Sequence, residues 1–295
     1  MEEIFVIKND GKKYPFSRGI MSRSLTRSGI SVEGSYDIVR SIKKNLVDRN
    51  IKKIESQELV KKISKELQKR GRILEEKYFR VSRQMKYFKK PIFILIGGGS
   101  GVGKSTISSA IGHRLGINRV IGTDTIREIM RSILTSNLVP TLHESSFKAG
   151  EKIETSLVQD KLIYGFEQQI SLVSQGVSSV LKRGIKEGLN MVINGVHIVP
   201  GFLNRKIIEN KGVVFHYILD VPKTEEHIRN FYSREEDSLR DPNKYIKEID
   251  DIRKLQNYII RRAKKRKIPV IKNVNFEKTM KTILEDIVDK LEKEL

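Results

Sequence analysis

Residues 98–105 read Gly-Gly-Ser-Gly-Val-Gly-Lys-Ser, which is the spacing G-x-x-x-x-G-K-S of a phosphate-binding loop, or P-loop. In such a loop, backbone N–H groups surround a polyphosphate at the N-terminus of a helix. Gly101 and Gly103 let the backbone approach the phosphates where a Cβ would collide. Lys104 offers a positive charge to the β- and γ-phosphate oxygens, and the Ser105 hydroxyl is suited to bind Mg²⁺. The chain is therefore predicted to bind a nucleoside triphosphate.

The residues around this loop have the patterns of a strand and a helix. Residues 91–96 form a short apolar run, and residues 105–115 read as a helix. This context favours a P-loop over the alternative, a glycine-rich turn with a chance lysine. Lys104 is predicted to be catalytic and Ser105 to be the metal ligand. The predicted ATP-binding residues are Gly98, Gly99, Ser100, Gly101, Val102, Gly103, Lys104, Ser105 and Thr106.

Alternating strand and helix patterns continue to the C-terminus. A long helical region is expected over residues 151–187, with a break near Gly176. Alternating elements of this kind are typical of a parallel sheet covered by helices on both faces, with ligands beyond the carboxyl ends of the strands. We therefore expect an α/β fold. Four further strands are predicted, at residues 119–122, 190–194, 212–220 and 268–271.

An acidic and a basic residue follow the end of the second predicted strand. Asp124 lies there, and Arg127 follows three residues later. Asp124 is predicted to be catalytic, because a carboxylate at this edge can orient or deprotonate an acceptor hydroxyl. Arg127 is predicted to hold an anionic acceptor through a bidentate contact. The alternative makes Asp124 the N-cap of a helix over residues 125–134, and the two roles are compatible.

The end of the third strand carries amide and imidazole groups. Asn194 stands where P-loop kinases often have an acidic residue that supports Mg²⁺. Because asparagine lacks that charge, the metal is expected to rely on Ser105, water and phosphates, or on Asp124. His197 is predicted to bind an acceptor phosphate. A structural role for this histidine remains the alternative.

A polar segment follows the fourth strand. It contains Arg229, Arg234 and Arg240, and we expect it to form a lid around residues 223–245. Arginines on such a lid neutralise charge on a transferring phosphoryl group while the lid excludes water. Arg234 is predicted to be catalytic, and Arg229 and Arg240 to bind substrate. Alternatively, some of these arginines pair with glutamates on a solvated helix face.

The composition adds a strong positive charge. The 295 residues carry a net charge of +21, and residues 1–90 hold 24 Lys and Arg against 11 Asp and Glu. Such a field attracts polyanions, whether nucleotides, phosphorylated metabolites or nucleic acid. The chain has no cysteine, which excludes disulfides and thiolate sites. With no signal-peptide pattern and no apolar run of the ~18 residues that span a membrane, a cytoplasmic protein is expected.

Residues 1–90 have a pattern of their own, with a strand at 4–7, a turn at 9–11, a strand at 12–16 and helical periodicity beyond. The run Val6-Ile7-Lys8-Asn9-Asp10-Gly11, with Pro15-Phe16, resembles the ATP-cone, a small regulatory nucleotide-binding module. The resemblance implies that Lys8, Lys12 and Lys13 contact phosphates of a regulatory nucleotide, although Asn9 replaces the usual arginine. A basic structural cap is the alternative. We expect this domain at 1–90 and a P-loop domain at 91–295.

Motifs that are missing narrow the function. Residues 243–246 read Asn-Lys-Tyr-Ile, which is not the guanine-reading motif N-K-x-D of GTPases. The chain also lacks the LSGGQ signature of ABC ATPases and the Asp-Glu strand end of helicase-type motors. By elimination, the sequence indicates a P-loop kinase that acts on a small acceptor.

The chain as a whole resembles the archaeal 2-phosphoglycerate kinases, in residues 98–106, 121–128, 194–201, 252–258 and 268–273. The resemblance implies Mg²⁺-dependent transfer from ATP to the 3-hydroxyl of 2-phosphoglycerate. The product, 2,3-diphosphoglycerate, would feed synthesis of cyclic 2,3-diphosphoglycerate. A nucleoside or nucleotide kinase remains open, because residues 219–222 are adenylate-kinase-like. An ATP-dependent nucleic-acid-binding protein is the alternative from another class.

Overall fold

The computed structural model describes residues 3–85, 88–154, 157–203, 208, 210–233 and 241–293. The chain divides into two compact units. Unit 1 comprises Met1–Phe88, His113–Gly116 and Leu284–Leu295, and unit 2 comprises Lys89–Gly112 and Ile117–Ile283. Two helices, α5 (Lys104–Leu115) and α13 (Phe276–Lys293), therefore contribute residues to both units.

Unit 1 combines a small sheet with helices. Strand β1 (Phe5–Ile7) pairs antiparallel with β2 (Lys13–Pro15) and parallel with β3 (Lys53–Glu55). Gly11, with φ of 75°, closes the predicted hairpin. The predicted hairpin and helices are present, whereas α1 and β3 are additional. The helices are α1 (Arg18–Arg27), α2 (Val32–Asp48), α3 (Ser56–Lys69) and α4 (Ile73–Gln84).

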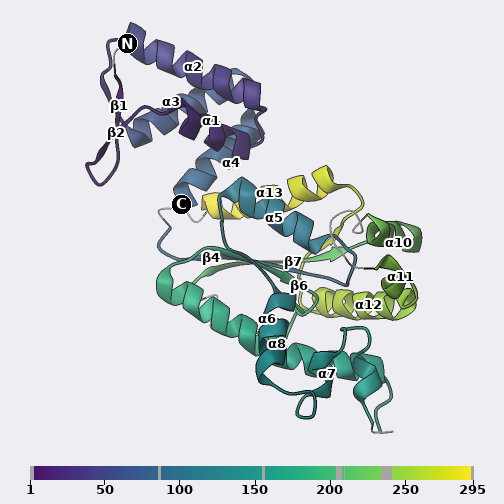
Figure 1. Ribbon diagram of the computed structural model, residues 1–295. Helices are drawn as coiled ribbons and strands as arrows, with labels where there is room; N and C mark the ends of the chain where they lie inside the picture. The colour runs from purple at the N-terminus through teal and green to yellow at the C-terminus, as the bar shows by residue number, and fades with distance from the viewer. Residues whose placement is uncertain are drawn as a thin grey trace. The chain divides into compact units, whose positions relative to one another are not determined.

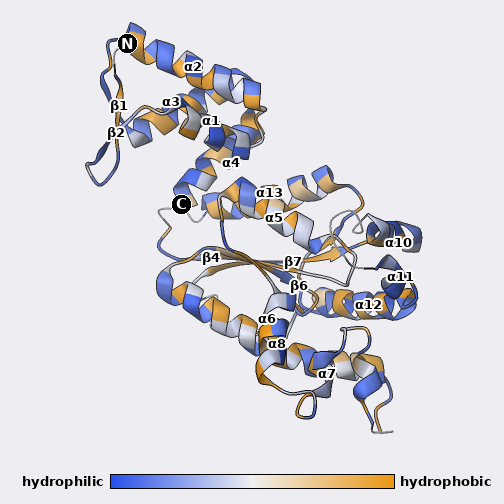
Figure 2. Cartoon of the chain, viewed as in Figure 1, coloured by the Kyte–Doolittle hydropathy of each residue, from blue (hydrophilic) through white to orange (hydrophobic). Residues whose placement is uncertain are grey.

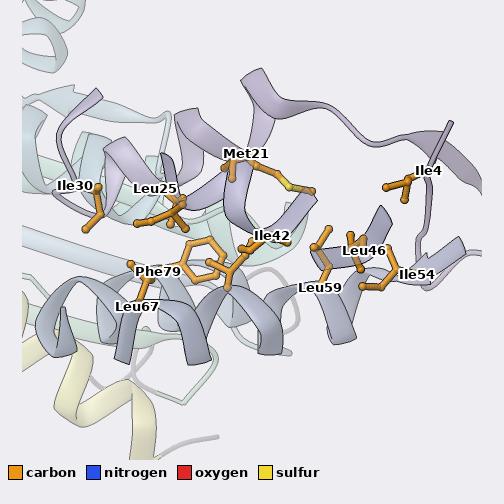
Figure 3. Close-up of a cluster of buried hydrophobic side chains, with 13 residues drawn as sticks. Ile4, Met21, Leu25, Ile30, Ile42, Leu46, Ile54, Leu59, Leu67 and Phe79 are labelled. Carbon is orange, nitrogen blue, oxygen red and sulfur yellow. The ribbon is translucent and has the colours of Figure 1, made fainter. Parts of the chain in front are cut away.

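The helices of unit 1 enclose their own hydrophobic core (Figure 3). The Ser17 and Ser31 hydroxyls cap α1 and α2 by accepting from backbone N–H groups of the first turn. Apolar side chains then meet from all four helices, and Leu25, Leu46 and Leu67 are completely buried. This core is separate from those around the larger sheet, so residues 1–90 are more than an extension of unit 2.

Unit 2 is built on a five-stranded parallel sheet with the order β5-β6-β4-β7-β8. All five predicted strands are present. Strand β4 is buried along its whole length, as expected for a strand covered on both faces. Figure 2 shows the central strands mostly in apolar colours, while the helices carry mixed ones. The strands are β4 (Ile92–Gly97), β5 (Val120–Gly122), β6 (Met191–Gly195), β7 (Val213–Asp220) and β8 (Val270–Lys272).

Helices cover both faces of this sheet (Figure 1), which confirms the predicted fold class. The unit 2 parts of α5 and α13 lie on one face, and α8 (Lys161–Glu187) and α12 (Ile249–Lys265) lie on the other. None of the helices in the described residues is long and apolar enough to cross a membrane. The described residues also contain the helices α6 (Thr123–Ile133), α7 (Pro140–His143), η2 (Ala149–Lys152), α10 (Thr224–Tyr232) and α11 (Pro242–Ile246).

The expected break near Gly176 is wrong. Helix α8 runs without interruption through this position. A Cβ on Gly176 would lie 2.5 Å from a methyl carbon of Ile126 in α6. The glycine therefore allows α8 and α6 to pack closely. The backbone hydrogen bonds of α8 stabilise the helix at this position.

Candidate active site

The P-loop, residues 98–105, connects the end of β4 to the start of α5 at the carboxyl edge of the sheet. Gly98, Gly101 and Gly103 have φ values of 141°, 86° and 82°, which L side chains rarely adopt. A Cβ on Gly101 would lie 2.5 Å from a ring carbon of Phe231. Both the backbone conformation and the close packing therefore require glycine here.

Lys104 is buried and directed at the loop itself. Its Nζ donates to the Gly99 carbonyl at 2.6 Å. The amine thus lies against the backbone that surrounds the phosphates in P-loop proteins, the position from which it can contact them.

Three side chains, two from α10 and one from the residue after β8, hold the outer side of the P-loop. The carbonyl of Ser100 accepts from His227 Nε2 at 2.6 Å, and that of Gly101 from Asn230 Nδ2 at 3.0 Å. The Val102 carbonyl accepts from Asn273 Nδ2 at 2.9 Å. Because three successive carbonyls are held on the outside, the loop can present its amides inward to an anion.

Gln256, on α12, is a fourth anchor. Its Oε1 accepts from the Gly99 N–H, and its Nε2 donates to the Leu219 carbonyl at 2.9 Å and to Asp220 Oδ1 at 3.3 Å. The side chain is 3% exposed and links the P-loop to the end of β7. Sequence reasoning gave these anchors no role. Gln256 and Asn273 do lie in segments that carried the family resemblance, whereas nothing in the sequence marked His227 or Asn230.

We expect Gln256→Ala to raise the KM for ATP about fivefold, because the loop loses an anchor worth ~1 kcal/mol. Steady-state kinetics at saturating acceptor measures this change. Asn257→Ala, at the exposed neighbouring position, is the matched control and should leave the KM for ATP unchanged. Equal KM values in the two variants would show that the anchor does not shape the nucleotide site.

Ser105, in the first turn of α5, lies beside Asn194 at the end of β6. The Ser105 hydroxyl donates to Asn194 Oδ1 at 3.4 Å, and Asn194 is buried at the end of β6. Two oxygen atoms therefore meet beside the P-loop. Among the described residues, no group of three or more His, Cys, Asp or Glu side chains could hold a metal ion. A metal here would thus take its other ligands from substrate phosphates and water.

Asp124 lies in the first turn of α6, and Arg127 follows it three residues later. The N-cap of this helix is Gly122, which makes no side-chain capping bond, so the alternative of Asp124 as the N-cap is wrong. The exposed carboxylate instead lies inside the first turn, where the helix dipole favours an anion. Arg127 donates to the Glu144 carbonyl. Burial lowers the pKa of Arg127, and the Asp124 carboxylate acts in the opposite direction.

His197 lies in the loop after β6 and is 1% exposed. Its Nδ1 contacts Thr123 Oγ1 at 2.9 Å, and its Nε2 contacts Gln169 Oε1 at 2.9 Å. Burial lowers the pKa of His197 to about 4, so the ring is neutral at neutral pH. A neutral ring with both nitrogens bonded inside the protein is not suited to the predicted contact with an acceptor phosphate.

The predicted lid is described only in part. Arg229 is exposed on α10, the helix whose His227 and Asn230 hold the P-loop. Arg234 and Arg240 lie outside the described residues. The roles of the three arginines therefore stay predictions.

Unit 1 contains a cavity of about 1080 Å³ with a basic lining from the hairpin turn after β1, from α3 and from α4. Lys8 is one of its lining residues, and Lys8 Nζ also lies 4.0 Å from the ring centroid of Tyr14. Lys12 and Lys13, at the other side of the hairpin turn, do not line it. The cationic lining residues are Lys8, Lys61, Lys65, Arg80 and Arg83.

Several curated proteins that are similar to this chain come from archaea and are named 2-phosphoglycerate kinase. The protein from Pyrococcus furiosus is 42% identical over 289 residues, which cover 97% of this chain and 94% of the relative. The protein from Thermococcus kodakarensis is 42% identical over 95% of both chains. That from Methanopyrus kandleri is 39% identical, over 97% of this chain and 87% of the relative.

Residues 4–90 match the family model described as the ATP cone domain. Among solved structures, shikimate kinase from Acinetobacter baumannii in complex with shikimate is 18% identical, with a TM-score of 0.41, over 70% of this chain and 98% of that one. A gluconokinase from Sinorhizobium meliloti is 13% identical, with a TM-score of 0.38, over 70% of this chain and 99% of that one.

Proposed function

Because the chain belongs to the family of archaeal 2-phosphoglycerate kinases, we propose that it phosphorylates the 3-hydroxyl of 2-phosphoglycerate with ATP. The observation that carries this proposal is the 42% identity over nearly the full chain, joined to a complete P-loop at the sheet edge. The products are ADP and 2,3-diphosphoglycerate, which would feed synthesis of its cyclic form. Donor, acceptor and product are small polyanions, as the net charge of +21 favours.

On the donor side, we assign the phosphates of ATP to residues 98–106. In the reaction, the acceptor oxygen bonds to the γ-phosphorus, and the bond from that phosphorus to the bridging oxygen of ADP breaks. Negative charge builds up on ADP and on the transferring group. Lys104 is suited to neutralise it, because its amine already lies inside the P-loop, at the Gly99 carbonyl.

On the acceptor side, Asp124 takes the proton of the 3-hydroxyl or orients that hydroxyl toward the γ-phosphate. Arg127 binds the carboxylate or the 2-phosphate of the acceptor. Arg229, Arg234 and Arg240 are assigned to a lid, with Arg234 in a catalytic role and Arg229 and Arg240 in substrate binding. His197 is assigned to the support of this site, since its ring is buried.

Mg²⁺ is the metal that this chemistry requires, and the residues fit it. Ser105 Oγ and Asn194 Oδ1 are hard oxygen donors next to the P-loop, and Mg²⁺ prefers oxygen ligands with several waters and substrate phosphates. Ser105 would bind the ion directly, and Asn194 or Asp124 would support its water ligands. When bound, the ion neutralises the phosphate oxygens of ATP.

An acceptor panel tests the proposed function. ADP release is measured with 2-phosphoglycerate, 3-phosphoglycerate, nucleosides, nucleoside monophosphates and RNA. We expect turnover with 2-phosphoglycerate at a kcat/KM at least a hundredfold above that of every other compound. Turnover with a nucleoside but not with 2-phosphoglycerate would favour the adenylate-kinase-like alternative. Stimulation by RNA alone would favour the nucleic-acid-binding alternative.

For residues 1–90, we propose a regulatory domain that binds a second nucleotide, with residues 91–295 as the kinase domain. The basic cavity of unit 1, which Lys8 lines, supports this proposal, and Lys12 and Lys13 would reach the phosphates only from the hairpin. Equilibrium binding should give two nucleotides per chain. Lys65→Glu, in the cavity wall, should remove one of them, whereas Lys69→Glu, exposed on the same helix outside the cavity, should not. One nucleotide per wild-type chain would favour a structural cap.

A further inference from the structure

A chain of buried polar side chains lies behind the first turn of α6. Thr123, the residue before Asp124, contacts His197, and His197 contacts Gln169 on α8, both at 2.9 Å. Thr123 and Gln169 are 0% exposed, and His197 is 1% exposed. Burying three polar side chains is costly unless their hydrogen bonds are made, so the arrangement has one well-defined geometry.

The direction of these hydrogen bonds follows from their far end. Gln169 Nε2 donates to the carbonyls of Thr141 at 2.7 Å and Glu144 at 3.0 Å. Its Oε1 is therefore the acceptor for His197, so His197 Nε2 carries the proton. His197 Nδ1 is then an acceptor, and the Thr123 hydroxyl donates to it. The burial that lowers the pKa of His197 to about 4 keeps the ring in this neutral form.

This series of hydrogen bonds returns to α6 through Arg127. The Glu144 carbonyl that accepts from Gln169 also accepts from Arg127 Nη1, one helical turn after Thr123. The first turn of α6 is thus held at both ends. Asp124 lies between these two ends, as the residue after Thr123.

Thr123 is also fixed against the sheet. A Cβ on Gly195, at the end of β6, would collide with Thr123 Oγ1. Gly195 follows Asn194, the residue that accepts from Ser105 of the P-loop. The contact of Thr123 with the end of β6 therefore fixes the acceptor side of the site relative to the donor side.

We propose that His197 is a positioning residue that, through Thr123 and Gln169, fixes the first turn of α6 and so aims Asp124 and Arg127 at the acceptor. The inference rests on the proposed function in one respect, the assignment of Asp124 and Arg127 to the acceptor side. His197 itself touches neither substrate. Its neutral ring accepts from Thr123 on one side and donates to Gln169 on the other.

Two matched pairs of variants test this role. Thr123→Val removes the hydroxyl with little change of shape, and Thr123→Ser keeps it. His197→Asn keeps an acceptor at the place of Nδ1, and His197→Gln keeps a donor at the place of Nε2. We expect Thr123→Val and His197→Gln to lower kcat with acceptor about tenfold or more, with the KM for ATP changed less than twofold. Thr123→Ser and His197→Asn should stay within about threefold of wild type.

Two further measurements separate positioning from packing. Acceptor-independent ATP hydrolysis should be the same in all four variants, because the donor side is intact. The double variant Thr123→Val/His197→Gln should lose no more kcat than either single variant, since both break the same contact. The proposal would be overturned if these variants melted at a lower temperature than the wild type but had the same kcat per folded molecule. Equal kcat values for Thr123→Val and Thr123→Ser would also overturn it.

The wild-type protein in the same assay distinguishes this inference from the proposed function. If the wild type fails with 2-phosphoglycerate but accepts another compound of the panel, the proposed acceptor is wrong. The four variants are then assayed with that compound, and the same ordering of kcat values is expected.

Discussion

Lys104→Ala is expected to lower kcat/KM for phosphoryl transfer about 10³-fold while the fold is retained. The amine lies against the P-loop backbone at Gly99, so its removal takes away the one side-chain charge inside the loop that can meet the γ-phosphate. The substitution removes the hydrogen bond from the Lys104 amine to the Gly99 carbonyl. The Gly99 N–H still donates to Gln256. The circular dichroism spectrum should therefore match that of the wild type.

Lys182→Ala is the matched control, because Lys182 is exposed on α8 and carries the same charge. Its kcat/KM should equal that of the wild type at ~0.15 M salt, where long-range attraction is largely screened. A Lys104→Ala protein that folds and retains a tenth or more of the wild-type activity would remove the P-loop lysine from the mechanism.

Asp124→Asn is expected to lower kcat about 10²-fold to 10³-fold while the KM for ATP changes less than threefold. The amide keeps the shape of the side chain but cannot accept the hydroxyl proton as a carboxylate can. Because Gly122 is the N-cap of α6, the substitution removes no capping bond. Initial rates over a grid of ATP and acceptor concentrations separate the two parameters.

Glu128→Gln serves as the control for Asp124, since it removes a carboxylate from the same helix one turn later. Glu128 pairs with Arg131 at the surface, and exposed pairs of this kind contribute little to stability. Its kcat should be unchanged. If Asp124→Asn weakens ATP affinity as much as it lowers kcat, Asp124 acts in metal support and not on the acceptor.

The main strands and the hairpin could be predicted from the sequence. The apolar runs that became β4, β6 and β7 are strands of the sheet, and the P-loop lies at its carboxyl edge, where ligands of a parallel sheet are expected. The hairpin around Gly11 was also predicted, because Asn9-Asp10-Gly11 is a strong turn signal. The local sequence is sufficient to predict an element when hydrophobic periodicity or turn residues determine its structure.

The errors arose where tertiary packing decides. Gly176 suggested a break in α8, but it exists to let α6 approach. β3 has only three residues, and its parallel pairing with β1 depends on contacts far apart in the sequence. His197 gives no sequence signal of burial, because its environment comes from α6 and α8. His227 and Asn230 meet the P-loop from α10, more than a hundred residues away in the chain.

Phosphorus NMR of the reaction products tests the central claim most directly. The purified chain is incubated with ATP, Mg²⁺ and 2-phosphoglycerate, and the spectrum is followed with time. We predict two new phosphomonoester resonances, those of 2,3-diphosphoglycerate, growing in equal intensity with the loss of one γ-phosphate per ADP formed. Release of inorganic phosphate with unchanged 2-phosphoglycerate would contradict the account, as would complete stability of ATP in the presence of this acceptor.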